Sequence, residues 1–149
     1  MKFGAKLPKS YYAYVGVDLE SQSKDDRQRI AISLSTYQAC KIEKYRYEKN
    51  GMSLQELFKR TLVEKNVVTK EDVNLKVTTR KKFDFMKNGE FNCESYANIG
   101  AGKQYLLYVS SYAKTKIIQY MLKNDIDLVW FMKQSFIEKG ILTVEDLSK

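Results

Sequence analysis

Residues 29–66, RIAISLSTYQACKIEKYRYEKNGMSLQELFKRTLVEKN, contain the pattern that decides the fold. The stretch opens with an alternating run that places Ile30, Ile32 and Leu34 on one face, which is typical of a half-buried β-strand. Two amphipathic stretches follow it and predict two helices. A lone strand leaves backbone N–H and C=O groups unpaired, which is costly when they are buried. The sequence must therefore supply a second strand.

The ends of the two helices carry recognisable capping residues. Ser35 or Thr36 can cap the first helix, and Asn50-Gly51 can end it. Ser53 with Glu56 three residues later matches the capping-box pattern and begins the second helix. These signals divide the stretch into strand, helix, turn and helix.

The same plan occurs a second time in the chain. Residues 127–148, DLVWFMKQSFIEKGILTVEDLS, align with residues 53–74, and residues 110–124 align with 35–49 after a one-residue slip in the turn. Identical positions include Lys41/Lys116, Tyr45/Tyr120, Lys59/Lys133, Glu64/Glu138, Lys65/Lys139, Thr69/Thr143 and Asp72/Asp146. Any two amphipathic helices share apolar positions, but matched charged positions indicate an internal repeat. The strand QYLLYV at residues 104–109 then lies over RIAISL.

The repeat divides the chain into four parts. We predict an N-terminal extension over 1–28, a first unit over 29–75, a linker over 76–103 and a second unit over 104–149. In the second unit the helices are expected at 111–124 and 128–139. Asn88-Gly89 in the linker predicts a hairpin turn. Residues 11–19 and 74–78 also have the composition of strands.

Composition places the protein among basic globular chains. It has 149 residues, a net charge of +8 and a pI near 9.3, with 44% hydrophobic and 30% charged residues. This charge favours an anionic partner such as nucleic acid, although it also serves ordinary solubility. Cys40 and Cys93 are isolated in sequence and are expected to be free thiols. With no signal-peptide pattern and no apolar run of membrane-spanning length, we expect a cytoplasmic protein that makes no membrane contact.

The residues needed for most catalytic and metal sites are missing from the sequence. It contains no histidine, and two isolated cysteines cannot form a zinc site. Phosphate-loop and dinucleotide-binding motifs do not occur. We therefore expect a binding protein with no cofactor or metal rather than an enzyme.

The strand, helix, turn and helix pattern resembles the ribbon-helix-helix superfamily of DNA-binding proteins, over residues 29–66 and 104–140. Two units in one chain resemble the TraY-type accessory proteins of conjugative relaxosomes. The resemblance implies an α+β, mostly helical fold, a tandem ribbon-helix-helix with an intramolecular two-stranded antiparallel ribbon. Extra short strands are expected in the N-terminal and linker segments.

The resemblance also implies which side chains read DNA bases in the major groove. By position they are Arg29, Ala31, Ser33, Gln104, Leu106 and Tyr108. Arg29 can donate two hydrogen bonds to guanine and Gln104 can pair with adenine. The second strand is apolar on both faces, so alignment alone assigns Tyr105, Leu107 and Val109 to the core. Leu106 and Tyr108 can therefore face DNA or be buried.

Phosphate contacts are implied at the start of the second helix of each unit, where free N–H groups suit an anion. The implied residues are Ser53, Leu54, Asp127 and Leu128, joined by Lys103 and Arg27 close to the ribbon. Lys24 and the basic run at residues 80–82 add nonspecific attraction. The carboxylate of Asp127 would oppose a neighbouring phosphate.

Taken together, the sequence predicts a sequence-specific binder of double-stranded DNA. Plasmid conjugation is the expected setting, in which the protein has an accessory role at a transfer origin. The expected partner is a relaxase or another relaxosome protein, and copies of the protein are expected to self-associate on DNA. A transcriptional repressor is an alternative on the same fold. A protein–protein interaction module, such as an antitoxin or a phage inhibitor, is a further alternative.

Overall fold

The strand of the first repeat pairs with the strand of the second. The computed structural model describes residues 7–100 and 102–149, and in it β1 (Gln28–Ser35) runs antiparallel to β4 (Gly102–Val109). Ile30 lies opposite Leu107, and Ile32 lies opposite Tyr105. The predicted pairing of two strands within one chain is therefore confirmed. Each strand gives the other the ladder partner that it lacks alone.

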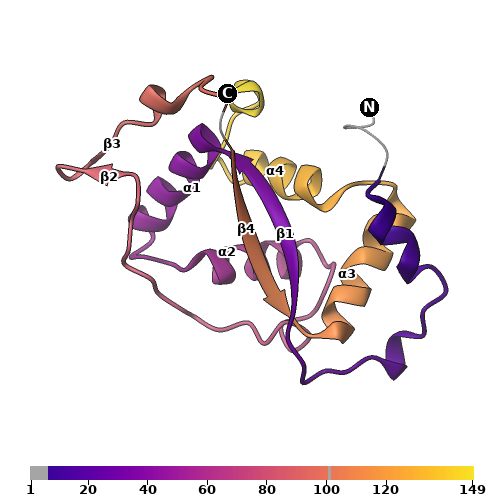
Figure 1. The fold of residues 1–149 in the computed structure, drawn as a ribbon. Helices are drawn as coiled ribbons and strands as arrows, with labels where there is room; N and C mark the ends of the chain where they lie inside the picture. The colour runs from indigo at the N-terminus through magenta and orange to yellow at the C-terminus, as the bar shows by residue number, and fades with distance from the viewer. Residues whose placement is uncertain (1–6, 101) are drawn as a thin grey trace.

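In the described ranges, four α-helices pack with this two-stranded ribbon in an α+β arrangement. They are α1 (Thr36–Glu48), α2 (Leu54–Glu64), α3 (Ser111–Asn124) and α4 (Leu128–Glu138). Figure 1 shows the ribbon crossing the molecule, with α1 to its left, α2 passing behind it, and α3 and α4 to its right. None of the helices in the described ranges has the length and apolarity to cross a bilayer.

Shorter elements occupy the extension, the linker and the C-terminus. The 3₁₀ helices are η1 (Lys9–Tyr14), η2 (Leu19–Ser21), η3 (Cys93–Tyr96) and η4 (Glu145–Ser148), and β2 (Met86–Lys87) pairs with β3 (Glu90–Phe91). The β2–β3 turn is the predicted hairpin, and both Asn88 and Gly89 adopt the positive φ that such a turn requires.

Local capping explains where α1 and α2 begin. The Ser35 hydroxyl accepts from the Gln38 N–H, and the Gln38 side chain accepts from the Ser35 N–H, which completes a capping box. At α2, Ser53 accepts from the Glu56 N–H at 3.1 Å, but the predicted box is only half formed. The Glu56 carboxylate accepts from the N–H of Thr78 in the linker instead.

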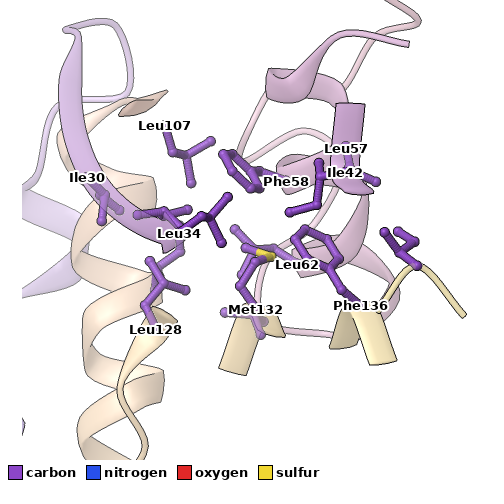
Figure 2. Close-up of a cluster of buried hydrophobic side chains, with 14 of the residues drawn as sticks. Ile30, Leu34, Ile42, Leu57, Phe58, Leu62, Leu107, Leu128, Met132 and Phe136 are labelled. Atoms are coloured by element: carbon purple, nitrogen blue, oxygen red, sulfur yellow. The ribbon is translucent and has the colours of Figure 1, made fainter. Parts of the chain in front are cut away.

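Side chains from both repeats fill one core beneath the ribbon. Figure 2 shows residues of both strands and of α1, α2 and α4 meeting there. Ile32, Leu107 and Phe58 are fully buried, and Phe58 stacks on Phe136 with ring centroids 6.2 Å apart. Because each unit contributes only half of this core, neither buries its apolar face without the other. The free thiol of Cys40 is also buried here.

Charged positions that match between the repeats form ion pairs across the two units. Lys65 pairs with Glu138, and Lys139 pairs with Glu64. Glu64 and Glu138 are equivalent, as are Lys65 and Lys139, so exchanging the units exchanges these two ion pairs. Such reciprocal contacts are the mark of an isologous interface, here within one chain.

A second reciprocal set lies near the ends of the units. Lys116 contacts Asp72 at 2.6 Å, and Lys41 lies 3.7 Å from Asp146. Each aspartate also accepts the N–H of the threonine three residues before it, at 2.8 Å in both units. The two units are thus related by a pseudo-twofold axis, which explains why these lysines and aspartates recur in the repeat.

Two predicted strands are not formed. Residues 11–19 instead form the end of η1, a turn and the start of η2. In this conformation Tyr11 reaches α4, and the carbonyls of Tyr14 and Val17 accept hydrogen bonds from the Gln119 side-chain amide at 3.0 and 2.9 Å. Residues 74–78 form no strand either. The linker is joined to the start of α2 by a bridge between Met52 and Thr79 and by hydrogen bonds of Thr78 with Ser53 and Glu56.

Asp72 and Asp146 make stability depend on pH. Burial opposes ionisation of Asp146, but the Thr143 N–H, the Tyr37 hydroxyl and Lys41 outweigh it and lower its pKa. Asp72 has a lowered pKa because Lys116 and the Thr69 N–H likewise outweigh burial. Since both folded pKa values lie below the unfolded value of about 3.9, this stability is present above that pH and is lost as pH falls through the folded values.

We predict that Asp146→Asn lowers the free energy of unfolding at pH 7 by about 1–3 kcal/mol, the cost of weakening hydrogen bonds to a buried charge. The double variant Asp72→Asn, Asp146→Asn should also flatten the acid limb of the stability curve. Urea unfolding at pH values from 3 to 7 measures both effects. Asp25→Asn, at an exposed position, is the control. An acid limb as steep as that of the parent protein would contradict the assignment.

Candidate nucleic-acid interface

One face of the ribbon points away from the core. Its side chains come from alternate positions of both strands. They are Arg29, Ala31 and Ser33 on β1 and Gln104, Leu106 and Tyr108 on β4. Leu106 and Tyr108 are half-buried and the others are exposed, whereas Leu107 and Val109 point into the core. The alignment-based assignment to the core is therefore confirmed for Leu107 and Val109, whereas Tyr105, the third residue assigned there, is only half-buried.

The strand register gives this outer face a defined layout. Arg29 lies opposite Tyr108, Ser33 lies opposite Gln104, and Ala31 lies opposite Leu106. Ala31 and Leu106 are equivalent positions of the two repeats, so the pseudo-twofold axis passes between them. One end of the face therefore presents arginine and tyrosine, while the other presents serine and glutamine.

Gln55 explains why Leu106 and Tyr108 are partly covered. Its side-chain amide donates to the Leu106 carbonyl and accepts from the Tyr108 N–H at 3.0 Å. The second residue of α2 thus satisfies the free edge of β4. The Arg27 guanidinium also lies 4.0 Å from the centroid of the Tyr108 ring. Tyr108 is consequently held in place while part of it stays accessible on the outer face.

The start of α2 lies beside β4, but the linker occupies part of it. Ser53 is buried, and its N–H donates to the Thr78 carbonyl at 2.9 Å. Its hydroxyl caps the Glu56 N–H and contacts the Thr78 hydroxyl. Leu54 is half-buried. Of the two residues predicted to hold phosphate in the first unit, Ser53 is engaged inside the protein and Leu54 lies nearer the surface.

The start of α4 is covered by the N-terminal extension. The Tyr11 hydroxyl accepts from the Leu128 N–H and donates to the Asp127 carboxylate, both at 3.1 Å. Leu128 is 1% exposed. These contacts occupy the two residues predicted to hold phosphate in the second unit. They also give the Asp127 carboxylate a hydrogen-bond donor.

Cations flank β4 at both ends. Arg27 lies beside Tyr108, and the exposed Lys103 lies near Tyr105, with its Nζ 5.5 Å from the ring centroid and 3.4 Å from the Asp84 carboxylate. Lys24 instead lies over the Tyr112 ring, at 4.6 Å. Arg27 and Lys103, the two cations predicted to contact phosphate, therefore both lie along β4.

Sequence reasoning did not single out Gln55 or Tyr11 for these roles. The repeat alignment holds a signal for Gln55, because valine stands at the equivalent position, Val129, and cannot make its two hydrogen bonds. Tyr11 had no such signal. Its contact with Leu128 joins residues from opposite ends of the chain, and no periodicity encodes it.

We predict that Tyr11→Phe lowers the free energy of unfolding by about 1–3 kcal/mol, because the buried Leu128 N–H loses its acceptor. Chemical denaturation measures the loss, and hydrogen exchange at the Leu128 amide should become faster. Tyr12→Phe removes a hydroxyl from a side chain that is 56% exposed and serves as the control. Unchanged exchange at Leu128 would show that Tyr11 does not cover this helix end.

The described parts of the chain contain no cluster of three or more acidic, cysteine or histidine side chains able to hold a metal ion. Comparisons with protein-family models, curated proteins and solved structures found no match. The exposed face of the ribbon and the charges around it are therefore the features of the described residues that bear on function.

Proposed function

We propose that this protein is a sequence-specific double-stranded DNA-binding protein that inserts its two-stranded ribbon into the major groove, as a tandem ribbon-helix-helix protein. The observation that carries the proposal is the outer face of the β1–β4 ribbon, which presents Arg29, Ser33 and Gln104 away from the core. The major groove of B-DNA is wide enough for a two-stranded ribbon. The net charge of +8 supports an anionic partner.

The chemistry of the outer face suits base recognition. Arg29 can donate two hydrogen bonds to guanine O6 and N7, and Gln104 can pair with adenine. Ser33 can donate or accept, and Ala31 and Leu106 can contact thymine methyl groups. Tyr108 offers a ring edge and one hydroxyl. These groups are held on a paired ribbon, so little backbone freedom is lost on binding.

The proposed phosphate contacts are unequal on the two sides of the ribbon. Arg27 and Lys103 flank β4, beside the start of α2. On the other side Tyr11 covers the start of α4. We propose that the β4 side carries more of the phosphate contact, and that the protein therefore binds its site in one orientation.

Unlike halves suit a DNA site with unlike half-sites. Such a site has a direction, as a plasmid transfer origin does, and we propose an accessory role there with a relaxase or another relaxosome protein as partner. A repressor would use the same face on an operator. Selection from a random duplex library identifies the preferred sequence and shows whether its halves differ.

Arg29→Ala tests the proposal. We expect it to weaken binding to the selected duplex about tenfold to a hundredfold, which corresponds to the roughly 1–3 kcal/mol of one good base contact. The affinity for random duplex should change far less, because nonspecific affinity comes from phosphate contacts. Fluorescence anisotropy at stated salt concentrations measures both affinities.

The control for this comparison is Lys123→Ala, which removes one exposed positive charge on α3. It should leave the preference for the selected duplex unchanged. Equal losses on both duplexes with Arg29→Ala would show that Arg29 does not read a base. No binding to any duplex at low salt would overturn the function itself and favour a protein–protein module.

A further inference from the structure

A groove runs along the free edge of β4, between that strand, α1, the start of α2 and the linker. Its volume is about 460 Å³, within the range of small-molecule sites. Four cationic side chains lie around it, namely Arg27, Arg80, Lys82 and Lys103, together with the carboxylate of Asp84, which lies 3.4 Å from Lys103. Tyr105 and Tyr108 line it from opposite faces of β4. The depression beside Ser33 and Ser35, near the other strand, is more open and lies against Lys133 and Lys149.

Two charged residues of α1 form the floor of the groove. Glu43 is 6% exposed and Arg46 is 7% exposed. One Glu43 oxygen accepts from the Phe85 N–H at 2.8 Å. Burial raises the pKa of Glu43, although the bond from Phe85 opposes that effect. Arg46 donates to the carbonyls of Met52 and Arg80, each at 2.7 Å.

The repeat provides an internal comparison for these two charges. The equivalent positions in the second unit hold Ile118 and Met121, which are buried in the core. Apolar side chains thus satisfy the fold at these positions. Replacing buried charges with well-packed apolar residues is often neutral or stabilising. The repeated fold does not require Glu43 and Arg46, which instead hold the linker at Phe85 and Arg80 and line a groove found beside the first unit.

The linker is fixed in a way that leaves its cationic side chains available. The backbone of Arg80 is held at both groups, because its N–H donates to the Gly51 carbonyl at 2.8 Å and its carbonyl accepts from Arg46. The side chains of Arg80 and Lys82 are exposed and line the groove. Their positions are set by backbone contacts that a side-chain substitution preserves.

The geometry points to a nucleotide-binding site in this groove. The cations suit a phosphate ester. Tyr105 and Tyr108 offer aromatic rings on which a base can stack, and so does the Arg27 guanidinium, which itself lies over the Tyr108 ring. Glu43 can accept a hydrogen bond from an N–H group of the base. The ligand class is therefore a nucleoside phosphate, either free or as one nucleotide of a DNA strand.

The two sources have different consequences for the ribbon. Leu106 and Tyr108 belong both to the groove and to the outer face. A free nucleotide bound beside them adds negative charge next to the proposed DNA surface and competes with duplex. A nucleotide of the DNA itself would instead make the groove part of the duplex-binding surface. This second consequence depends on the proposed function, but binding of a free nucleotide does not.

The test compares two double variants that each remove two positive charges. The groove variant, Arg80→Ala with Lys82→Ala, removes two positive charges from the rim of the groove. The control variant, Lys70→Ala with Lys123→Ala, removes two exposed positive charges away from the groove. Circular dichroism and thermal unfolding establish that both are folded. Calorimetric titration without DNA uses AMP, GMP, CMP, UMP and inorganic phosphate as probes. We expect at least one nucleotide to bind the parent protein at least tenfold more tightly than phosphate.

The groove variant should weaken that nucleotide at least tenfold and the control less than twofold. A second result would also support the site. If no mononucleotide binds, but the groove variant lowers duplex affinity at least tenfold more than the control does, the bound nucleotide is part of the DNA strand. Equal effects of the two variants in whichever assay shows binding would overturn it. The absence of binding in both assays would also overturn the proposal. If inorganic phosphate binds as tightly as every nucleotide, the groove is not a nucleotide site.

The variant Glu43→Gln distinguishes recognition of the base from binding of the phosphate. Glutamine keeps an oxygen to accept from Phe85 and removes the negative charge. A nucleotide whose base donates to Glu43 should lose at least fivefold in affinity, while phosphate is unchanged or binds more tightly. Equal tightening of nucleotide and phosphate would show that Glu43 acts only as a repelling charge and would overturn its role in base binding.

Discussion

The ladder between β1 and β4 is the contact on which the rest of the structure depends. A two-stranded ribbon is marginal by itself in water. Here its inner face closes a core to which α1, α2 and α4 contribute, with Phe58 stacked on Phe136. Pairing the strands antiparallel also forces the two repeats to face each other about the pseudo-twofold axis. The reciprocal contacts of Lys65 with Glu138 and Lys139 with Glu64 follow from that arrangement.

Much of this fold was predictable because the same pattern occurs twice. Alternation in residues 29–34 assigned one strand, and alignment assigned the faces of its apolar counterpart, where Leu107 and Val109 are buried. The failures have a different cause. Residues 11–19 have the composition of a strand, but the Tyr11 hydroxyl instead accepts a hydrogen bond from the Leu128 N–H far along the chain. Glu56 matches a capping box, but the linker competes for its carboxylate through Thr78.

The candidate site was only partly predictable for the same reason. The outward positions follow from period and register, so Arg29 and Gln104 could be named from sequence. Tertiary contacts decide the accessibility of their neighbours. Gln55 covers part of Leu106 and Tyr108, while Tyr11 occupies Leu128. In both cases a side chain supplies the hydrogen-bonding partner for a backbone group that the repeated plan leaves open.

Both strands of the ribbon belong to one polypeptide, and this has a consequence for assembly. Because β1 and β4 belong to one chain, their pairing is intramolecular and does not depend on protein concentration. The ribbon therefore survives dilution to levels at which a ribbon built from two separate chains would dissociate. A substitution in one strand also appears once in the ribbon rather than twice. The two halves can consequently diverge one residue at a time, as Arg29 and its counterpart Gln104 have done.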